Sequence, residues 1–116
     1  MARGLPQEVG ALHQPERNKY VVVCEDAAEI VGYVAWDIDT ARRHGGIEIL
    51  AVVPSHRRLG VGTMLCERAM ADMKSRGVEV VEVRTGGDAF HAPARRLYES
   101  LGYTLFPTAV YFSKLS

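Results

Sequence analysis

The stretch "ILAVVPSHRRLGVGTML", residues 49–65, constrains the fold more than any other, because the spacing of its apolar residues changes partway along. Residues 47–53, "IEILAVV", are almost continuously apolar, which is typical of a central strand covered on both faces. Pro54 ends that strand because proline cannot donate to a sheet ladder. From Gly60 to Arg76 the apolar residues recur at helical spacing, and Gly77 stands where a helix cap belongs. This stripe consists of Val61, Leu65, Cys66, Ala69, Met70 and Met73.

The rest of the chain adds short strands and one more helix. Runs rich in β-branched or aromatic residues predict strands at 20–25, 30–39, 78–84, 103–106 and 109–115. The first two form a hairpin around 26–29, the last two form a hairpin around Pro107 and Thr108, and residues 40–46 form a loop. Pro93 opens a second helix whose apolar residues follow at 94, 97, 98 and 101, with Gly102 as its stop. The order ββ, β, α, β, α, ββ predicts one α/β domain spanning residues 1–116.

Composition and charge narrow the function. The 116 residues fit a single small domain, and 14 basic residues balance 14 acidic ones, which argues against broad nucleic-acid binding. The start, "MARGLPQEVG", lacks the apolar core of a secretory signal, and no apolar run is long enough to cross a membrane. Cys24 and Cys66 lie in apolar patterns without metal-ligand spacing. We therefore expect a cytoplasmic protein with two reduced, buried thiols, no bound metal and no membrane partner.

The turn between the central strand and the first helix has the features of an anion site. A helix N-terminus presents unpaired N–H groups and partial positive charge, and glycines allow a ligand to approach the backbone closely. Arg57 and Arg58 would strengthen such a site, for which phosphate is the natural anion. No lysine and hydroxyl pair follows Gly62, as a P-loop requires, and Leu65 replaces the third glycine of a dinucleotide fingerprint. What remains is Arg-x-x-Gly-x-Gly, and a tight loop with a solvated arginine pair is the alternative interpretation.

Two segments together resemble the GNAT acyltransferase superfamily. "ILAVVPSHRRLGVGTML" is similar to its coenzyme A-binding motif, and "APARRLYESLGY" is similar to its second signature at Ala94, Leu97, Tyr98, Glu99, Gly102 and Tyr103. The resemblance covers residues 20–115. It implies a mixed, mostly antiparallel sheet with helices on both faces, in which strands 47–53 and 78–84 splay apart to admit the pantetheine arm.

The resemblance also implies the residues that hold acetyl-coenzyme A, the expected co-substrate. The diphosphate site falls on Arg57, Arg58, Leu59, Gly60, Val61, Gly62 and Thr63, mostly through backbone N–H groups. The edge of Leu50, Ala51 and Val52 would pair with pantetheine like an added strand, and one of its N–H groups would polarise the thioester carbonyl. His91 stands near a position where the family often has asparagine contacting the arm, and a surface loop histidine is the alternative.

Two side chains are candidates for acid–base catalysis. Tyr98 matches the family's usual general acid, which protonates the leaving thiolate; the alternative is a core tyrosine on the apolar stripe of its helix. Glu48 on the central strand is the candidate base that deprotonates an ammonium acceptor. Glu48 would otherwise bind the positive charge of the acceptor or simply be solvated at the splayed edge.

The acceptor-binding site is the part of the protein about which the sequence says least. Relatives generally place a strand and one or two helices before the first hairpin, whereas only the abbreviated segment 1–19 precedes residue 20 here. A symmetric homodimer would complete the acceptor site and cover the open sheet edge. The leading expectation is an acetyl-coenzyme A-dependent N-acetyltransferase that transfers acetyl directly to a small amine or peptide. The alternative is a catalytically silent acyl-coenzyme A-binding or regulatory module.

Overall fold

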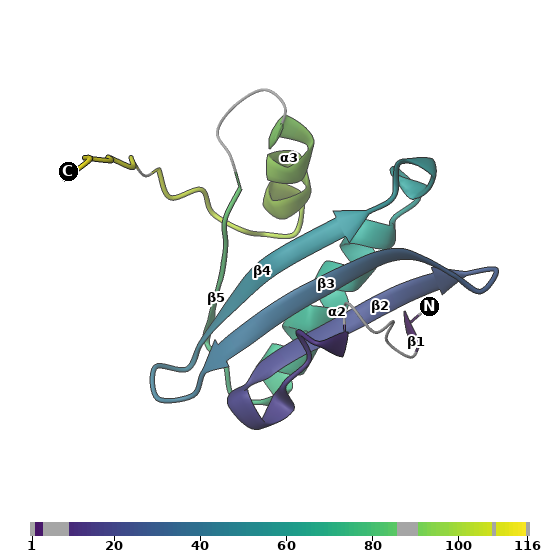
Figure 1. Cartoon of the computed structure of the whole chain (residues 1–116), viewed down its shortest axis with the longest axis horizontal. Helices are drawn as coiled ribbons and strands as arrows, with labels where there is room; N and C mark the ends of the chain where they lie inside the picture. The colour runs from purple at the N-terminus through teal and green to yellow at the C-terminus, as the bar shows by residue number, and fades with distance from the viewer. Residues whose placement is uncertain (1, 4–9, 86–90, 108, 116) are drawn as a thin grey trace. The chain divides into compact units, whose positions relative to one another are not determined.

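The computed structural model describes residues 2–3, 10–85, 91–107 and 109–115, and these form two compact units. The first unit, Met1–Arg84, holds the sheet and its long helix, and the second unit, Thr85–Ser116, holds one shorter helix (Figure 1). Each unit is described by itself.

The first unit is a five-stranded mixed sheet in the order β1-β2-β3-β4-β5. Its strands are β1 (Ala2–Arg3), β2 (Lys19–Asp26), β3 (Glu29–Asp39), β4 (His44–Val52) and β5 (Val80–Val83). The first four run antiparallel to their neighbours, and β4 pairs in parallel with β5. Short 3-10 helices, η1 (Pro15–Arg17) and η2 (Pro54–His56), precede β2 and follow β4. The mixed, mostly antiparallel sheet predicted from the sequence is thereby confirmed.

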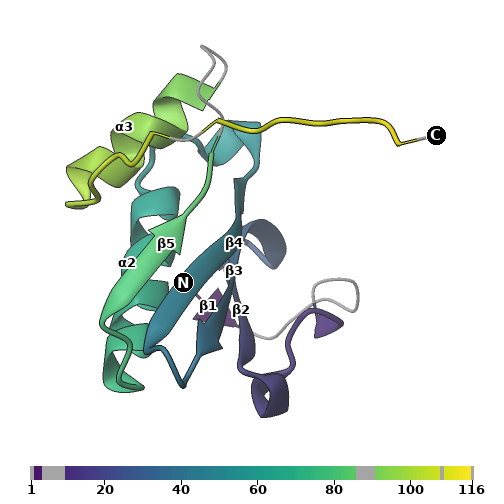
Figure 2. The same cartoon turned by 90° about the vertical axis from the view of Figure 1, so that its left-hand side faces the viewer.

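Helix α2 (Val61–Ser75) covers one face of this sheet (Figure 2). Its predicted apolar stripe is confirmed, because Leu65, Cys66, Ala69 and Met73 are all buried. The backbone of β3 at Gly32 lies against the side chain of Leu65. The Asp72–Arg76 pair closes the helix with a 2.9 Å contact between Oδ2 and Nε. The face of the sheet on which α2 packs is therefore fixed, and the other face carries a separate buried cluster of Val21, Val23 and Ala35.

Several turns hold residues at positive φ, which glycine adopts readily and alanine does not. Between β2 and β3, Ala27 and Ala28 both have positive φ, at 51° and 66°, as a two-residue type I′ hairpin requires. Gly77 follows α2 with φ of 88°, a conformation that glycine adopts without a Cβ penalty. Both cysteines are buried, as expected, and burial raises the pKa of Cys66 to about 11.

Two strand predictions were wrong. The predicted loop 40–46 is shorter, because β4 begins at His44, where pairing with β3 and β5 holds the two glycines that follow in the sheet. The predicted hairpin at the C-terminus is absent from the described residues 103–107 and 109–115. An isolated two-stranded hairpin is marginal in water, and Pro107 offers no N–H to a ladder.

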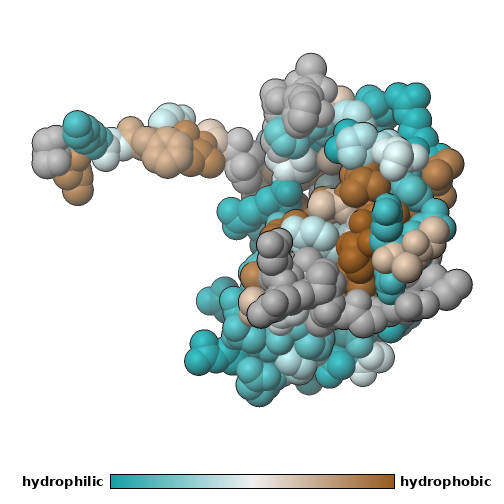
Figure 3. Space-filling model, turned by 45° about the vertical axis from the view of Figure 1, so that its right-hand side comes forward, coloured by the Kyte–Doolittle hydropathy of each residue, from teal (hydrophilic) through white to brown (hydrophobic). Residues whose placement is uncertain are grey.

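The second unit contains α3 (Ala92–Ser100), which the sequence predicted from Pro93 to Gly102. Tyr98 is its buried side chain, and Gly102 follows with φ of 91°. Apolar and aromatic side chains along the following segment are exposed (Figure 3). They are Leu105, Phe106, Val110, Tyr111, Phe112 and Leu115.

Candidate functional site

The turn between η2 and α2 presents an open helix N-terminus. Its N-cap, Gly60, has φ of 81° and contributes no side-chain hydrogen bond, and the first helical bond runs from the N–H of Met64 to the Gly60 carbonyl at 3.0 Å. Among the described residues, no carbonyl accepts a hydrogen bond from the N–H groups of residues 61–63. A Cβ built on Gly60 would meet nothing within 4 Å. Several donors therefore face open space at the positive end of a helix dipole, which is the arrangement that binds anions.

Two arginines precede this N-terminus and have different roles. Arg58 is exposed and has φ of 64°, a left-handed conformation that bends the turn back towards the helix. Arg57 donates from Nε to the Val52 carbonyl at 3.2 Å, so its side chain braces the turn against the end of β4. His56 ties the same turn to the β2–β3 hairpin, through a 2.8 Å contact between Nε2 and Oδ2 of Asp26. The turn is therefore held at both of its flanks before any ligand binds.

Strand β4 has an open edge along its second half. Its parallel pairing with β5 extends only from His44 to Ile47, whereas β4 itself continues to Val52. No other strand in the described part of the chain pairs with β4 on that side. The two strands thus part after Ile47, and main-chain groups beyond that point are available to an extended ligand.

The direction of each main-chain group on this edge follows from antiparallel pairing. The N–H of Val53 donates to the Val31 carbonyl at 2.9 Å, and the groups of successive residues alternate between the two sides of a strand. Ala51 therefore points its N–H and carbonyl at β3, and Leu50 and Val52 point theirs at the open edge. Of the three edge residues predicted from the sequence, Leu50 has the N–H and carbonyl that a ligand can reach, since Arg57 holds the Val52 carbonyl.

Glu48 lies at a β-bulge. In the pairing of β3 with β4, Ala35 is opposite Ile49 and the next residue, Trp36, is opposite Ile47, so Glu48 is an extra residue. The bulge places Glu48 exposed on the face of the sheet away from α2, immediately before the open edge begins. A bulge re-aims a side chain, and here pairing of β3 with β4 resumes directly after it, with Ala35 opposite Ile49.

A second carboxyl group, that of Asp37, interacts with Glu48. A hydrogen bond to Asp37, desolvation and the charge of Asp37 raise the pKa of Glu48, and the positive charge of Lys19 partly opposes them. A hydrogen bond between two carboxyl groups requires a proton on one of them. Glu48 is thus a carboxylate whose pKa is raised, chiefly by its hydrogen bond with Asp37, which makes it a stronger base than an ordinary glutamate.

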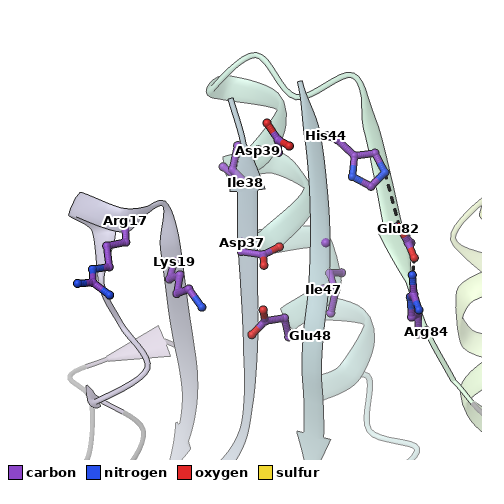
Figure 4. A pocket seen from close by; sticks show the side chains of 11 residues that line it. Arg17, Lys19, Asp37, Ile38, Asp39, His44, Ile47, Glu48, Glu82 and Arg84 are labelled. Carbon is purple, nitrogen blue, oxygen red and sulfur yellow. Dashed lines mark hydrogen bonds and ion pairs between the residues drawn. The ribbon is translucent and has the colours of Figure 1, made fainter. Parts of the chain in front are cut away.

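These groups line a pocket of about 500 Å³ formed by residues of the first unit (Figure 4). Its floor is a row across four strands in register: Lys19 is opposite Asp37, Asp37 opposite Gly46, and Gly46 opposite Glu82. Gly46, at the centre of the row, has no side chain to fill the pocket. A Cβ on Gly46 would lie 3.0 Å from Oδ1 of Asp37. We call this space the charged pocket. Figure 4 shows Asp37 and Glu48 pointing towards one another, with Lys19 approaching from β2.

The two remaining site residues predicted from the sequence belong to the second unit. Tyr98 is buried on α3, where its ring forms an edge-to-face contact with Tyr103 at 5.7 Å between centroids. His91 is the exposed N-cap of α3. The structure therefore brings Glu48, the β4 edge and the helix N-terminus together in one unit, and it assigns Tyr98 and His91 to the other.

Sequence reasoning missed the other half of the carboxyl pair. Asp37 and Lys19 stood in predicted strands, but nothing in the sequence alone fixed their register with Glu48. Gly46 was placed in a loop and not in β4. The alternation of strand 30–39 was a usable signal, because a polar residue at 37 in an otherwise apolar run indicates a solvated position on one face.

Within the described residues, no group of three or more histidine, cysteine, aspartate or glutamate side chains is placed to hold a metal ion. No described helix combines the length and the apolar character needed to cross a membrane.

Comparison with known proteins gives a consistent family. The family model for acetyltransferases of the GNAT family matches residues 3–103. An N-alpha-acetyltransferase of Sulfurisphaera tokodaii is 33% identical over 104 residues, which cover 78% of this chain and 60% of that protein. YsnE of Bacillus subtilis, an uncharacterised N-acetyltransferase, is 37% identical over 67 residues, which cover 58% of this chain and 43% of that protein. The chain thus spans about half the length of these relatives.

A solved structure shares the fold. An aminoglycoside N-acetyltransferase in complex with coenzyme A superposes with a TM-score of 0.73 at 15% identity, over 85% of this chain and 78% of that one.

Proposed function

Because the chain belongs to the GNAT acetyltransferase family, we propose that it transfers an acetyl group from acetyl-coenzyme A directly to a primary amine of a small-molecule or peptide acceptor. The observation that carries the proposal is the combination of two features on one strand. The bulge of β4 carries a carboxylate with a raised pKa, and the same strand leads through an open edge to an unpaired helix N-terminus.

The helix N-terminus would hold the diphosphate of the coenzyme. The N–H groups of Val61, Gly62 and Thr63 are unpaired in the described part of the chain, and exposed Arg58 adds positive charge beside them. Leu59 and Gly60 shape the turn so that the ligand can approach the backbone. The pantetheine arm would then run along the open edge of β4, accepting and donating main-chain hydrogen bonds at Leu50.

Glu48 would remove the proton that blocks attack by the amine. An alkylammonium ion is not a nucleophile, so the acceptor must lose a proton before its nitrogen can attack the thioester carbon. A carboxylate whose pKa is raised is a stronger base than an ordinary glutamate, and Asp37 is the group chiefly responsible for that rise. The charged pocket admits the acceptor to Glu48 from the solvent side of the sheet.

The transfer itself needs two further groups. Attack of the amine on the carbonyl carbon gives a tetrahedral oxyanion, which the outward-facing N–H of Leu50 is oriented to stabilise. The carbon–sulfur bond then breaks, the acetyl group stays on nitrogen as an amide, and the thiolate of coenzyme A takes a proton. Tyr98 is our candidate for that proton donor, and His91 for a contact to the pantetheine arm.

The test is release of free thiol from acetyl-coenzyme A across a panel of primary amines, followed with a thiol-reactive dye. Release that depends on one class of amine, with a matching acetylated product by mass spectrometry, would support the proposal. A melting temperature that rises with acetyl-coenzyme A, without release from any amine, would instead support a silent coenzyme-binding module. Neither binding nor release at millimolar coenzyme would overturn both interpretations.

A further inference from the structure

We propose that the acceptor is a zwitterion, an amine that also carries an anionic group such as a carboxylate, and that Arg17 and Lys19 bind the anionic end. This inference rests on the proposed function and adds the chemical class of its acceptor. It follows from which charges of the charged pocket are already paired and which are not.

On the side of the charged pocket nearest β5, the charged side chains neutralise one another. Glu82 accepts a hydrogen bond from Nε of Arg84 at 2.6 Å and lies 3.8 Å from Nε2 of His44 (Figure 4). On the neighbouring row, Asp39 accepts from the backbone N–H of Arg42 at 3.2 Å and pairs with its guanidinium at 3.8 Å. These groups have protein partners, so they offer a ligand little uncompensated charge.

On the side formed by η1 and β2, the cationic side chains have no such partners among the described residues. Arg17 at the end of η1 and Lys19 at the start of β2 both line the pocket and are exposed. In the described part of the chain, neither forms an ion pair or a hydrogen bond through its side chain, and Lys19 acts on Glu48 only through its charge. Asp37 and Glu48 form the remaining pair, two carboxyl groups that interact with one another. The pocket thus offers an acidic centre for an amine and two free cations beside it.

The geometry sets the size of the acceptor. Lys19 on β2 and Glu48 on β4 lie two strands apart, which is about 10 Å between backbones at the usual strand spacing. Both residues line the charged pocket, and Glu48 points towards Asp37 on the strand between them (Figure 4), so an acceptor that contacts both must reach across β3. A dipeptide, or an amino acid with its amine a few bonds from the carboxylate, spans such a gap. A polycation would place a second ammonium group against Arg17 and Lys19, which like-charge repulsion disfavours.

The deciding experiment compares acceptors that differ only in the anionic group. Glycylglycine and glycylglycinamide have the same length and the same attacking amine, and an aminoglycoside supplies a polycation. We expect thiol release with a kcat/KM several-fold higher for glycylglycine than for its amide, because each exposed ion pair is worth up to about fivefold. The aminoglycoside should be the poorest acceptor of the three.

Two variants test whether Arg17 and Lys19 cause the preference for glycylglycine over its amide. Lys19→Met and Arg17→Met should each raise KM for glycylglycine several-fold, without a matching rise in KM for glycylglycinamide. Because the charge of Lys19 lowers the pKa of Glu48, the variants are compared at a pH above the acid limb of the pH–rate profile. Lys74→Met and Arg68→Met, on the exposed side of α2, are matched controls that should alter neither substrate. Calorimetric titration with glycylglycine measures acceptor binding independently of turnover.

The outcomes separate the two proposals. Equal use of the dipeptide and its amide, or a preference for the aminoglycoside, would overturn the zwitterion inference and leave the acetyltransferase proposal standing. Glycylglycine that binds through Lys19 without thiol release would support the inference about the pocket and count against the proposed transfer. Absence of both binding and release would overturn the inference.

Discussion

Replacing Gly60 by alanine separates the ligand-binding role of the α2 N-terminus from its role in folding. Gly60 has φ of 81°, and a Cβ there would meet no atom within 4 Å. Gly77, just beyond the other end of the same helix, has φ of 88° and the same open surroundings. Gly77→Ala is therefore a control with the same backbone cost at a position distant from the proposed diphosphate site.

The expected stability cost is the same for both variants. A left-handed conformation costs an alanine about 1–2 kcal/mol, and the smaller entropy of the unfolded alanine chain returns about 0.4–1 kcal/mol. The net loss of about 1 kcal/mol should lower the melting temperature by roughly 4 °C in a chain of 116 residues. Thermal melts followed by circular dichroism would measure both shifts.

The binding cost should differ between them. A methyl group at residue 60 enters the space through which a phosphate reaches the N–H groups of residues 61–63. Loss of one charge-assisted hydrogen bond is worth about 1.5–3 kcal/mol, so the Kd for coenzyme A should rise roughly 10- to 150-fold in Gly60→Ala. It should be unchanged in Gly77→Ala. Calorimetric titration well below both melting temperatures is the assay, and equal affinities in the two variants would refute the assignment of this turn to the diphosphate.

Three further predictions concern the proposed catalytic groups, each measured by thiol release between pH 5 and 10. Glu48→Gln should lower kcat at neutral pH by about 100-fold or more and move the optimum to higher pH, where the amine deprotonates unaided; an unchanged profile would reject Glu48 as the base. Asp37→Asn should move the acid limb of the pH–rate profile to lower pH, because it removes the hydrogen bond and the charge that raise the pKa of Glu48, so Glu48 ionises at a lower pH. An acid limb that stays in place would show that it reports the titration of another group. Tyr98→Phe should lower kcat while the Kd for coenzyme A stays within about twofold, and full activity would remove Tyr98 from the mechanism.

The sequence predicted the elements whose periodicity reports their surroundings. The apolar stripe of α2 could be predicted because its buried residues all face one sheet, and burial imposes helical spacing on them. These residues are Leu65, Cys66, Ala69 and Met73. The C-terminal residues carry an equally apolar pattern, yet they form no strand in the described part of the chain. A strand depends on a partner edge as well as on its own composition, and the composition of residues 103–115 says nothing about whether that edge exists.

The pair of carboxyl groups shows a second limit of prediction from sequence, which is the register between β3 and β4. Glu48 could be singled out as the charge in an apolar strand, but its chemistry depends on Asp37, a residue eleven positions earlier on another strand. Regular pairing of β3 with β4 would preserve the two-residue alternation of both strands, and the bulge at Glu48 breaks it. The bulge puts Glu48 and Ile49 on the same face, where both are exposed. One inserted residue thus turns a glutamate towards an aspartate, two residues before Leu50 on the open edge, so the base and the coenzyme edge of the proposed site lie next to one another on one strand.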